Sequence, residues 1–246
     1  MNFSFNHRLG TTLEATVGLA LLLAVGTIAA QQAPSMADEA TVIQKVDAAV
    51  KARIDGMDGY TVQEHYVVYR NKDEVHPAAE MVVKTTYRRE SGKSYTILSQ
   101  SGSEMIRSMV LGSILDNEKR LNLPGIREGA WFTSANYEMK LKPGGPVVVD
   151  GRDCLALSLT PRRKTPFLIH GTLWVDANDG AIVHVEGTAA KNSSLVTGPT
   201  QMMRQYATVS GFSQATHVRA VSGSFLLGQT VVKIDYQDYQ IELRAQ

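Results

Sequence analysis

The residues of this sequence that could do chemistry are few and scattered. His65, His184 and His217 each alternate with apolar neighbours, which is typical of residues on the solvent face of a half-buried strand. None is spaced as a metal-binding pair on one strand face or at the i, i+4 interval of a helical pair. No Gly-x-Ser-x-Gly nucleophile motif occurs. We therefore predict no catalytic residue, no metal and no cofactor.

Glu64 is the polar residue that departs from its pattern. It follows Tyr60 and Val62 and precedes Tyr66 at two-residue steps, so alternation places it on an apolar strand face. A buried carboxylate there would have a raised pKa and could be functional. A β-bulge that turns Glu64 outward is the alternative. A hydrolase built on His65 and Glu64 is the corresponding functional hypothesis, and no motif supports it.

Composition excludes several classes of protein. The chain has 246 residues, with 25 Lys and Arg against 24 Asp and Glu, and 43% of its residues are hydrophobic. A near-neutral chain of this kind is neither disordered nor a strongly basic nucleic-acid binder, so we expect no nucleic-acid partner. Cys154 is the single cysteine of the sequence, which excludes an intramolecular disulfide. An apolar core must stabilise the fold.

The N-terminal segment resembles an export signal. Residues 17–30 are uninterruptedly apolar and end in small residues, after a modest positive start at His7 and Arg8. The run is short for a membrane-spanning helix, which needs about 20 residues. We predict a cleavable signal peptide at 1–30, a single domain at 31–246 and a periplasmic location, with an uncleaved N-terminal anchor as the alternative.

The remaining sequence predicts a mainly β fold. Apolar residues at three- and four-residue steps indicate one helix from Asp38 to Gly56 and a second between Ser103 and Leu121. Period-two alternation between and after them indicates about 10–11 antiparallel strands. A sheet of so many strands must curl, split or close. We expect it to curl around the two helices and leave an apolar cavity or groove, which suits an apolar ligand.

One hairpin carries a resemblance to a known family. Gly171-Thr172-Leu173-Trp174-Val175-Asp176 is followed by Asp179-Gly180-Ala181-Ile182-Val183. This resembles the outer-membrane lipoprotein-sorting proteins, the LolA/LolB-like superfamily that also includes the regulator RseB. The resemblance implies an unclosed β half-barrel of a single curved antiparallel sheet, with helices on its concave, hydrophobic side.

The resemblance also implies a function without covalent chemistry: reversible burial of acyl chains by a periplasmic carrier of lipids or lipoproteins. Its partners would be a lipid or lipidated protein and a receptor protein at the inner or outer membrane, and we expect a monomer. An envelope-stress sensor domain that docks on a membrane regulator is the alternative. The residues that alternation or helical spacing would place along the cavity are Tyr66, Tyr87, Tyr95, Ile97, Met109, Leu115, Leu157, Trp174 and Val185.

Overall fold

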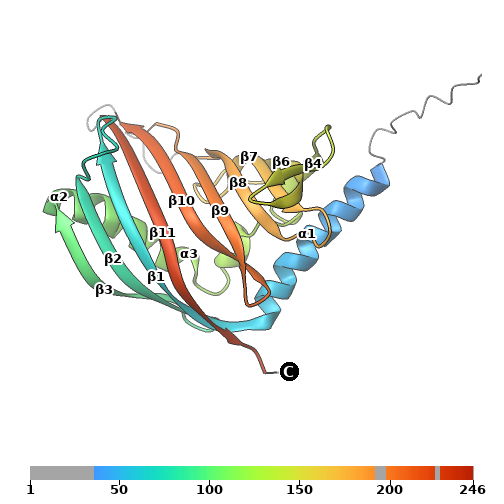
Figure 1. Ribbon diagram of the computed structural model, residues 1–246, viewed down its shortest axis with the longest axis horizontal. Coiled ribbons are helices and arrows are strands. Elements are labelled where there is room, and N and C mark those ends of the chain that lie inside the picture. The colour runs from blue at the N-terminus through green and yellow to red at the C-terminus, as the bar shows by residue number, and fades with distance from the viewer. Residues whose placement is uncertain (1–35, 192–197, 225–227, 246) are drawn as a thin grey trace, which may run out of the picture. The chain divides into compact units, whose positions relative to one another are not determined.

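The computed structural model describes residues 36–191, 198–224 and 228–245. The predicted signal peptide, residues 1–30, lies outside the described residues. The strands are β1 (Met57–Arg70), β2 (Ala79–Arg88), β3 (Gly92–Gly102), β4 (Tyr137–Leu141), β5 (Val147–Val149), β6 (Arg152–Pro161), β7 (Ile169–Asp176), β8 (Ile182–Ala189), β9 (Gln201–Val209), β10 (Phe212–Ser224) and β11 (Gly228–Leu243). All their pairings are antiparallel, and together they form one sheet (Figure 1).

The strand order shows how the sheet is assembled. It runs β3-β2-β1-β11-β10-β9-β8-β7-β6-β4, with β5 paired to β6. Neighbours in this order are consecutive along the chain except for β1–β11 and β6–β4. The β1–β11 pair joins an N-terminal three-strand meander to the later strands. The path leaves β3 and β4 at opposite edges, so the sheet stays open. This confirms the predicted fold class.

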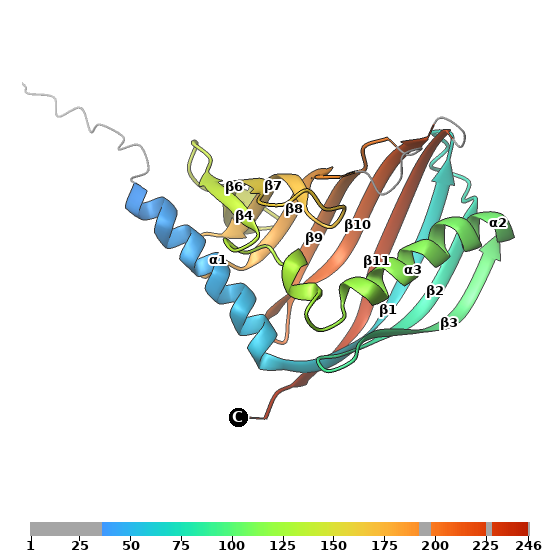
Figure 2. The same cartoon turned by 180° about the vertical axis from the view of Figure 1, so that it is seen from behind.

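The helical segments lie on the concave side of the sheet (Figure 2). They are α1 (Met36–Gly56), α2 (Glu104–Ile106), the π-helical turn η1 (Arg107–Gly112), α3 (Ser113–Leu121) and the short 3₁₀ turn η2 (Arg127–Ala130). The second predicted helix is therefore α2, η1 and α3 in succession. Ser103 is its N-cap, because the Ser103 side chain accepts a hydrogen bond from the Ile106 backbone N–H. None of the helices in the described part of the chain combines the length and apolar character that a membrane span requires.

Each helical segment covers its own apolar cluster. Val42 and Val46 of α1 are buried against β4 and β6–β8, where Leu157, Leu159 and Leu173 are fully buried. Ile106, Leu111 and Leu115 of the α2–α3 segment are buried against β1, β2, β10 and β11, in a second cluster with Tyr66, Val68 and Val83. Because each segment buries a single face on the sheet, space remains between α1 and α3 at the centre of the concave side.

Candidate functional site

A cavity of about 570 Å³ occupies this central space. Such a volume lies within the range of small-molecule sites, about 300–1,000 Å³. Its apolar wall consists of Ala48, Ala49, Val50, Ala52, Leu121, Ala130, Trp131, Phe132, Phe167, Ala181, Ile182, Met202, Phe212 and Ala215. Its polar wall includes Arg53, Tyr60, Lys93, Glu118, Asn122, Arg127, Asp179, Arg204, Tyr206, Ser213, Gln214, Tyr236 and Tyr239. The wall is therefore amphipathic, and its described residues include neither histidine nor cysteine.

The position of α1 along the cavity is fixed by polar contacts outside it. Asp47 accepts hydrogen bonds from the backbone N–H and the hydroxyl of Ser134, at 2.9 and 2.5 Å. Near the other end of the helix, Glu39 accepts one from the backbone N–H of Leu141 at 2.8 Å. The turn of the β7–β8 hairpin approaches α1 at Gly180, where φ is +73° and a Cβ would lie 2.5 Å from the carbonyl carbon of Lys45. Glycine is required there for both reasons, and it lets the hairpin close one side of the cavity.

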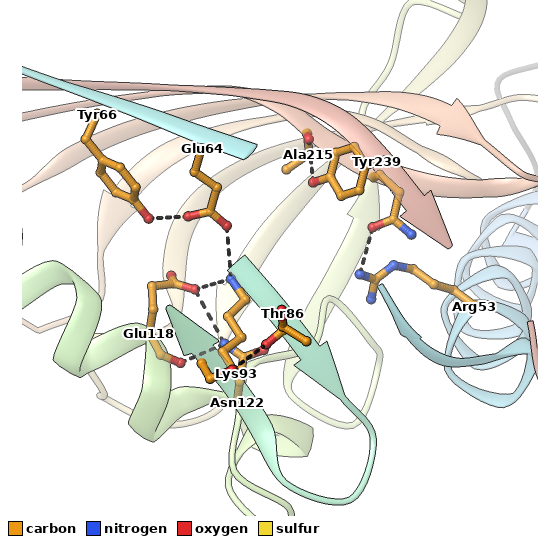
Figure 3. Close-up of polar contacts among 11 residues, drawn as sticks. Arg53, Glu64, Tyr66, Thr86, Lys93, Glu118, Asn122, Ala215 and Tyr239 are labelled. Atoms are coloured by element: carbon orange, nitrogen blue, oxygen red, sulfur yellow. Dashed lines mark hydrogen bonds and ion pairs between the residues drawn. The ribbon is translucent and has the colours of Figure 1, made fainter. Parts of the chain in front are cut away.

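A buried ion network lies at the other side, between β1, β3 and α3 (Figure 3). The Lys93 ammonium is 2.8 Å from Glu118 Oε2 and 4.0 Å from Glu64 Oε1. The Lys93 side chain is 9% exposed and that of Glu64 only 1%. Tyr66 donates its phenolic hydrogen to Glu64 Oε2, and Asn122 donates to the backbone carbonyl of Glu118. We call these residues (Glu64, Tyr66, Lys93, Glu118 and Asn122) the Lys93 network.

Glu64 is thus a buried carboxylate. The sheet does have an irregularity nearby, between Thr61 and Gln63 in the pairing of β1 with β11. It does not turn Glu64 outward, because the Tyr66 hydroxyl and the Lys93 ammonium lie on the concave side and stabilise the carboxylate there. The bulge interpretation is therefore wrong. The buried group is part of an ion network with β3 and α3.

The charges of this network stabilise one another. Burial alone would lower the pKa of Lys93, but the carboxylates of Glu118 and Glu64 outweigh it and raise that pKa well above its ordinary value. Burial would likewise raise the pKa of Glu118, yet Lys93 and Arg204 hold it below its ordinary value of 4.5. Burial and the neighbouring Glu64 carboxylate raise the pKa of Tyr66, which stays a hydrogen-bond donor. Lys93 and Glu118 are therefore both charged at neutral pH.

The turn between β2 and β3 positions Lys93 against α3. Gly92 has a φ of +82°, and a Cβ at this residue would lie 2.8 Å from the carbonyl oxygen of Asn122. Asn122 is the C-cap residue of α3. The absence of a side chain at Gly92 allows the turn to lie directly against the end of the helix, which brings the next residue, Lys93, to Glu118.

Three arginines line the cavity, and two of them, Arg53 and Arg204, form no ion pair with a carboxylate of the described residues. Arg53 of α1 donates to the side-chain oxygen of Gln214 at 3.1 Å. Arg204 of β9 is hydrogen-bonded to the side chain of Tyr206, and the Glu118 carboxylate stabilises its positive charge. Its Nε is buried without a hydrogen-bond partner within the described ranges. The cavity wall therefore contains guanidinium groups that could donate hydrogen bonds to a bound anion.

The nine sequence-predicted cavity residues occupy other positions. None of them is among the residues that line this cavity. Tyr66, Leu115, Leu157 and Val185 are buried in the two apolar clusters. Tyr87, Tyr95 and Trp174 are partly buried, and Ile97 and Met109 are 50% and 54% exposed. The structure brings Tyr66, Tyr95 and Leu115 together under the α2–α3 segment, and Leu157 and Val185 together beneath α1. Their role in ligand binding stays a prediction.

Sequence reasoning missed the charged residues of the cavity, although a signal for them exists. Lys93 lies two residues before Tyr95 on β3, and Arg204 lies between Met202 and Tyr206 at two-residue steps on β9. Both therefore share a strand face with apolar or aromatic residues, as Glu64 does. Scoring every charged residue that interrupts an apolar alternation would have found Lys93 and Arg204 together with Glu64.

None of the histidines at described positions lines the cavity. His65 on β1 and His217 on β10 are both paired in register with Asp235 on β11. Their side chains lie beside carboxylates, with His217 Nδ1 at 2.6 Å from Asp235 and His65 Nε2 at 3.2 Å from Glu80. No three metal-ligating side chains gather into a site within the ranges that the structure covers.

The fold has relatives among solved structures. It is similar to that of LolA superfamily proteins. A LolA superfamily protein from Nitrosomonas europaea shares 12% identity over 85% of this chain and 94% of its own, with a TM-score of 0.44. A putative outer membrane lipoprotein-sorting protein domain from Vibrio parahaemolyticus gives 12% identity, 86% and 95% coverage and a TM-score of 0.44. A DUF1329 family protein from Desulfovibrio piger gives 15% identity, 87% and 96% coverage and a TM-score of 0.42.

These similarities concern the path of the chain through sheet and helices. Two of these solved structures carry the name of the superfamily that the Trp174 hairpin resembles in sequence. No protein-family model matches the sequence, and no curated protein matches it.

Proposed function

We propose that this protein is a periplasmic carrier that binds an amphipathic lipid, free or attached to a lipoprotein, in the central cavity. The observation that carries the proposal is the cavity wall, which has a long apolar side along α1 and a polar side around Lys93 and Arg204. An acyl chain fits the first kind of surface and a head group fits the second. Binding and release would need no covalent chemistry.

The apolar side offers enough free energy for such binding. Each buried methylene contributes about 0.8 kcal/mol, so about 16 methylenes contribute roughly 13 kcal/mol before losses. Association and ordering consume at least about 4 kcal/mol of this. The remainder, at most roughly 9 kcal/mol, corresponds to a Kd no lower than about 0.3 μM, which is micromolar binding once further ordering costs are included. A carrier needs affinity in this range, because it must also release its ligand.

Native mass spectrometry tests the proposal on protein purified without detergent. A discrete added mass that solvent extraction identifies as an acyl-bearing molecule is the expected result. A protein that carries no added mass and takes up no lipid on incubation would contradict it, and an accompanying protein instead of a lipid would favour the sensor alternative.

Two matched variants on α1 test the location. Ala52 and Ala40 are both exposed on this helix, but only Ala52 lines the cavity. Ala52→Trp should fill the cavity and lower lipid uptake by about tenfold or more, since several methylenes lose their place. Ala40→Trp should bind as the wild type does. Met109→Glu tests the sequence-predicted residues separately, and normal uptake by this variant would exclude Met109 from the binding surface.

A further inference from the structure

The charge distribution of the cavity wall indicates which kind of head group it receives. Among the described lining residues, four are cationic (Arg53, Lys93, Arg127 and Arg204), whereas Glu118 and Asp179 are the carboxylates. Lys93 is already matched by Glu118 and Glu64. Arg127 is paired with Glu128 and donates to Tyr87. Arg53 and Arg204 are therefore the lining cations that form no such ion pair with a described carboxylate.

Of these two arginines, Arg204 is the one whose hydrogen-bonding capacity is not fully used. Its guanidinium lies in the cavity wall, and its Nε is buried without a hydrogen-bond partner in the described structure. A buried donor without a partner is unfavourable, and more so when it belongs to a charged group. Arg204 helps to lower the pKa of Glu118, but Glu118 Oε2 already accepts hydrogen bonds from Lys93 and Asn122. An anion bound in the cavity would bring an acceptor to this guanidinium.

The surroundings of Arg204 fit the head of an amphiphile. Tyr206 and Tyr236 line the same part of the wall and offer phenolic donors, while Met202, two residues away on β9, begins the apolar wall. The guanidinium presents a planar fork that matches a carboxylate or phosphate with two parallel hydrogen bonds. An acyl chain that leaves this point runs toward Ile182 and the alanines of α1, which line the same cavity.

We propose that the ligand is a single-chain amphiphile with an anionic head group, a carboxylate or a phosphate, which Arg204 binds. This inference rests on the proposed function and narrows it, because the lipid moiety of a lipoprotein carries no such anionic head. The uncharged ester of the same chain should therefore bind more weakly.

The test compares cis-parinaric acid with its methyl ester by fluorescence titration. Wild-type protein should bind the acid about tenfold or more tightly than the ester, as expected when a charge-assisted hydrogen bond is lost. Arg204→Gln should reduce that preference to less than about threefold while it leaves the affinity for the ester unchanged. Arg219→Gln is the matched control on β10; Arg219 pairs with Glu74 outside the cavity, and its loss should leave both affinities as they are.

The outcomes separate this inference from the proposed function. Equal binding of acid and ester to the wild type would overturn the inference and leave the lipid carrier intact, and this comparison needs no variant to fold. A preference lost in Arg53→Gln but kept in Arg204→Gln would also overturn the assignment to Arg204. If neither probe binds, both proposals fail. Displacement of the acid by oleate or by lysophosphatidate then distinguishes a carboxylate from a phosphate head.

Discussion

The two halves of the concave side are stabilised by different interactions. Beneath α1, the buried residues are apolar and come from β4 and β6–β8, with Leu157, Leu159 and Leu173 fully buried. Beneath the α2–α3 segment, an apolar cluster lies beside the Lys93 network, in which the Glu64 carboxylate and the Lys93 ammonium are buried and the Glu118 carboxylate is partly buried. Apolar contacts do not depend on pH and require no specific partner, whereas a buried charge requires its counter-charge. The comparison indicates that the packing of α3 on the sheet depends on intact ion pairs, whereas the packing of α1 on its apolar cluster does not.

The largest effect should come from removing the ammonium at the centre of the network. Lys93→Ala leaves Glu64 and Glu118 buried without their cation, which we expect to lower the free energy of unfolding by about 3–5 kcal/mol. Urea denaturation measures this. Lys140→Ala is the control, because the Lys140–Glu138 pair is exposed and its loss should leave the free energy of unfolding nearly unchanged.

A neutral network sharpens this prediction. Lys93→Met combined with Glu64→Gln and Glu118→Gln removes all three charges and keeps similar side-chain volumes. This triple variant should be markedly more stable than Lys93→Ala alone, since it leaves no buried charge unpaired. If the triple variant is as unstable as Lys93→Ala, the loss of stability comes from packing and not from unpaired charge. The proposed contrast between an ion-paired α3 side and an apolar α1 side would then be wrong.

Acid should weaken the α3 half before the α1 half. The folded pKa of Glu118 lies below its ordinary value of 4.5, so the charged form stabilises the fold. This contribution is complete above the unfolded value and is lost as the pH falls through the lowered folded value. Hydrogen exchange should therefore show the amides of α3 losing protection below pH 4.5 while those of Leu157 and Leu173 keep it. Glu118→Gln should remove this pH dependence, and a dependence that persists in the variant would assign it elsewhere.

The smallest effect concerns the start of the α2–α3 segment. Ser103→Ala removes the acceptor for the Ile106 N–H and should lower the free energy of unfolding by about 1 kcal/mol. Ser108→Ala, exposed within η1, should change it by less than about 0.5 kcal/mol. Equal effects of the two substitutions in urea denaturation would show that the cap contributes nothing to holding this cover in place.

Local patterns were sufficient to predict most of the fold. Strict alternation in residues such as Val62, Tyr66 and Val68, and the Asn178-Asp179-Gly180 turn, predicted strands and a hairpin that the structure contains. The pairing of β1 with β11 could not be predicted this way, because strand pairing between distant segments leaves no local period. The same limit applies to the site. The cavity lies between α1, β9 and α3, and only the tertiary fold brings Ala52, Arg204 and Glu118 to one wall.

The pairing of β1 with β11 also constrains how the molecule forms. Met57 lies opposite Leu243, so the middle of the sheet joins segments from the two ends of the described chain. Until β11 is available, β1 has one unpaired edge, and the β1–β3 meander has nothing to connect it to the later strands. Contacts of such long sequence separation form slowly, because a large loop must close before they are made. Because Tyr236 and Tyr239 of β11 line the cavity, its wall is incomplete until this long-range pairing has formed.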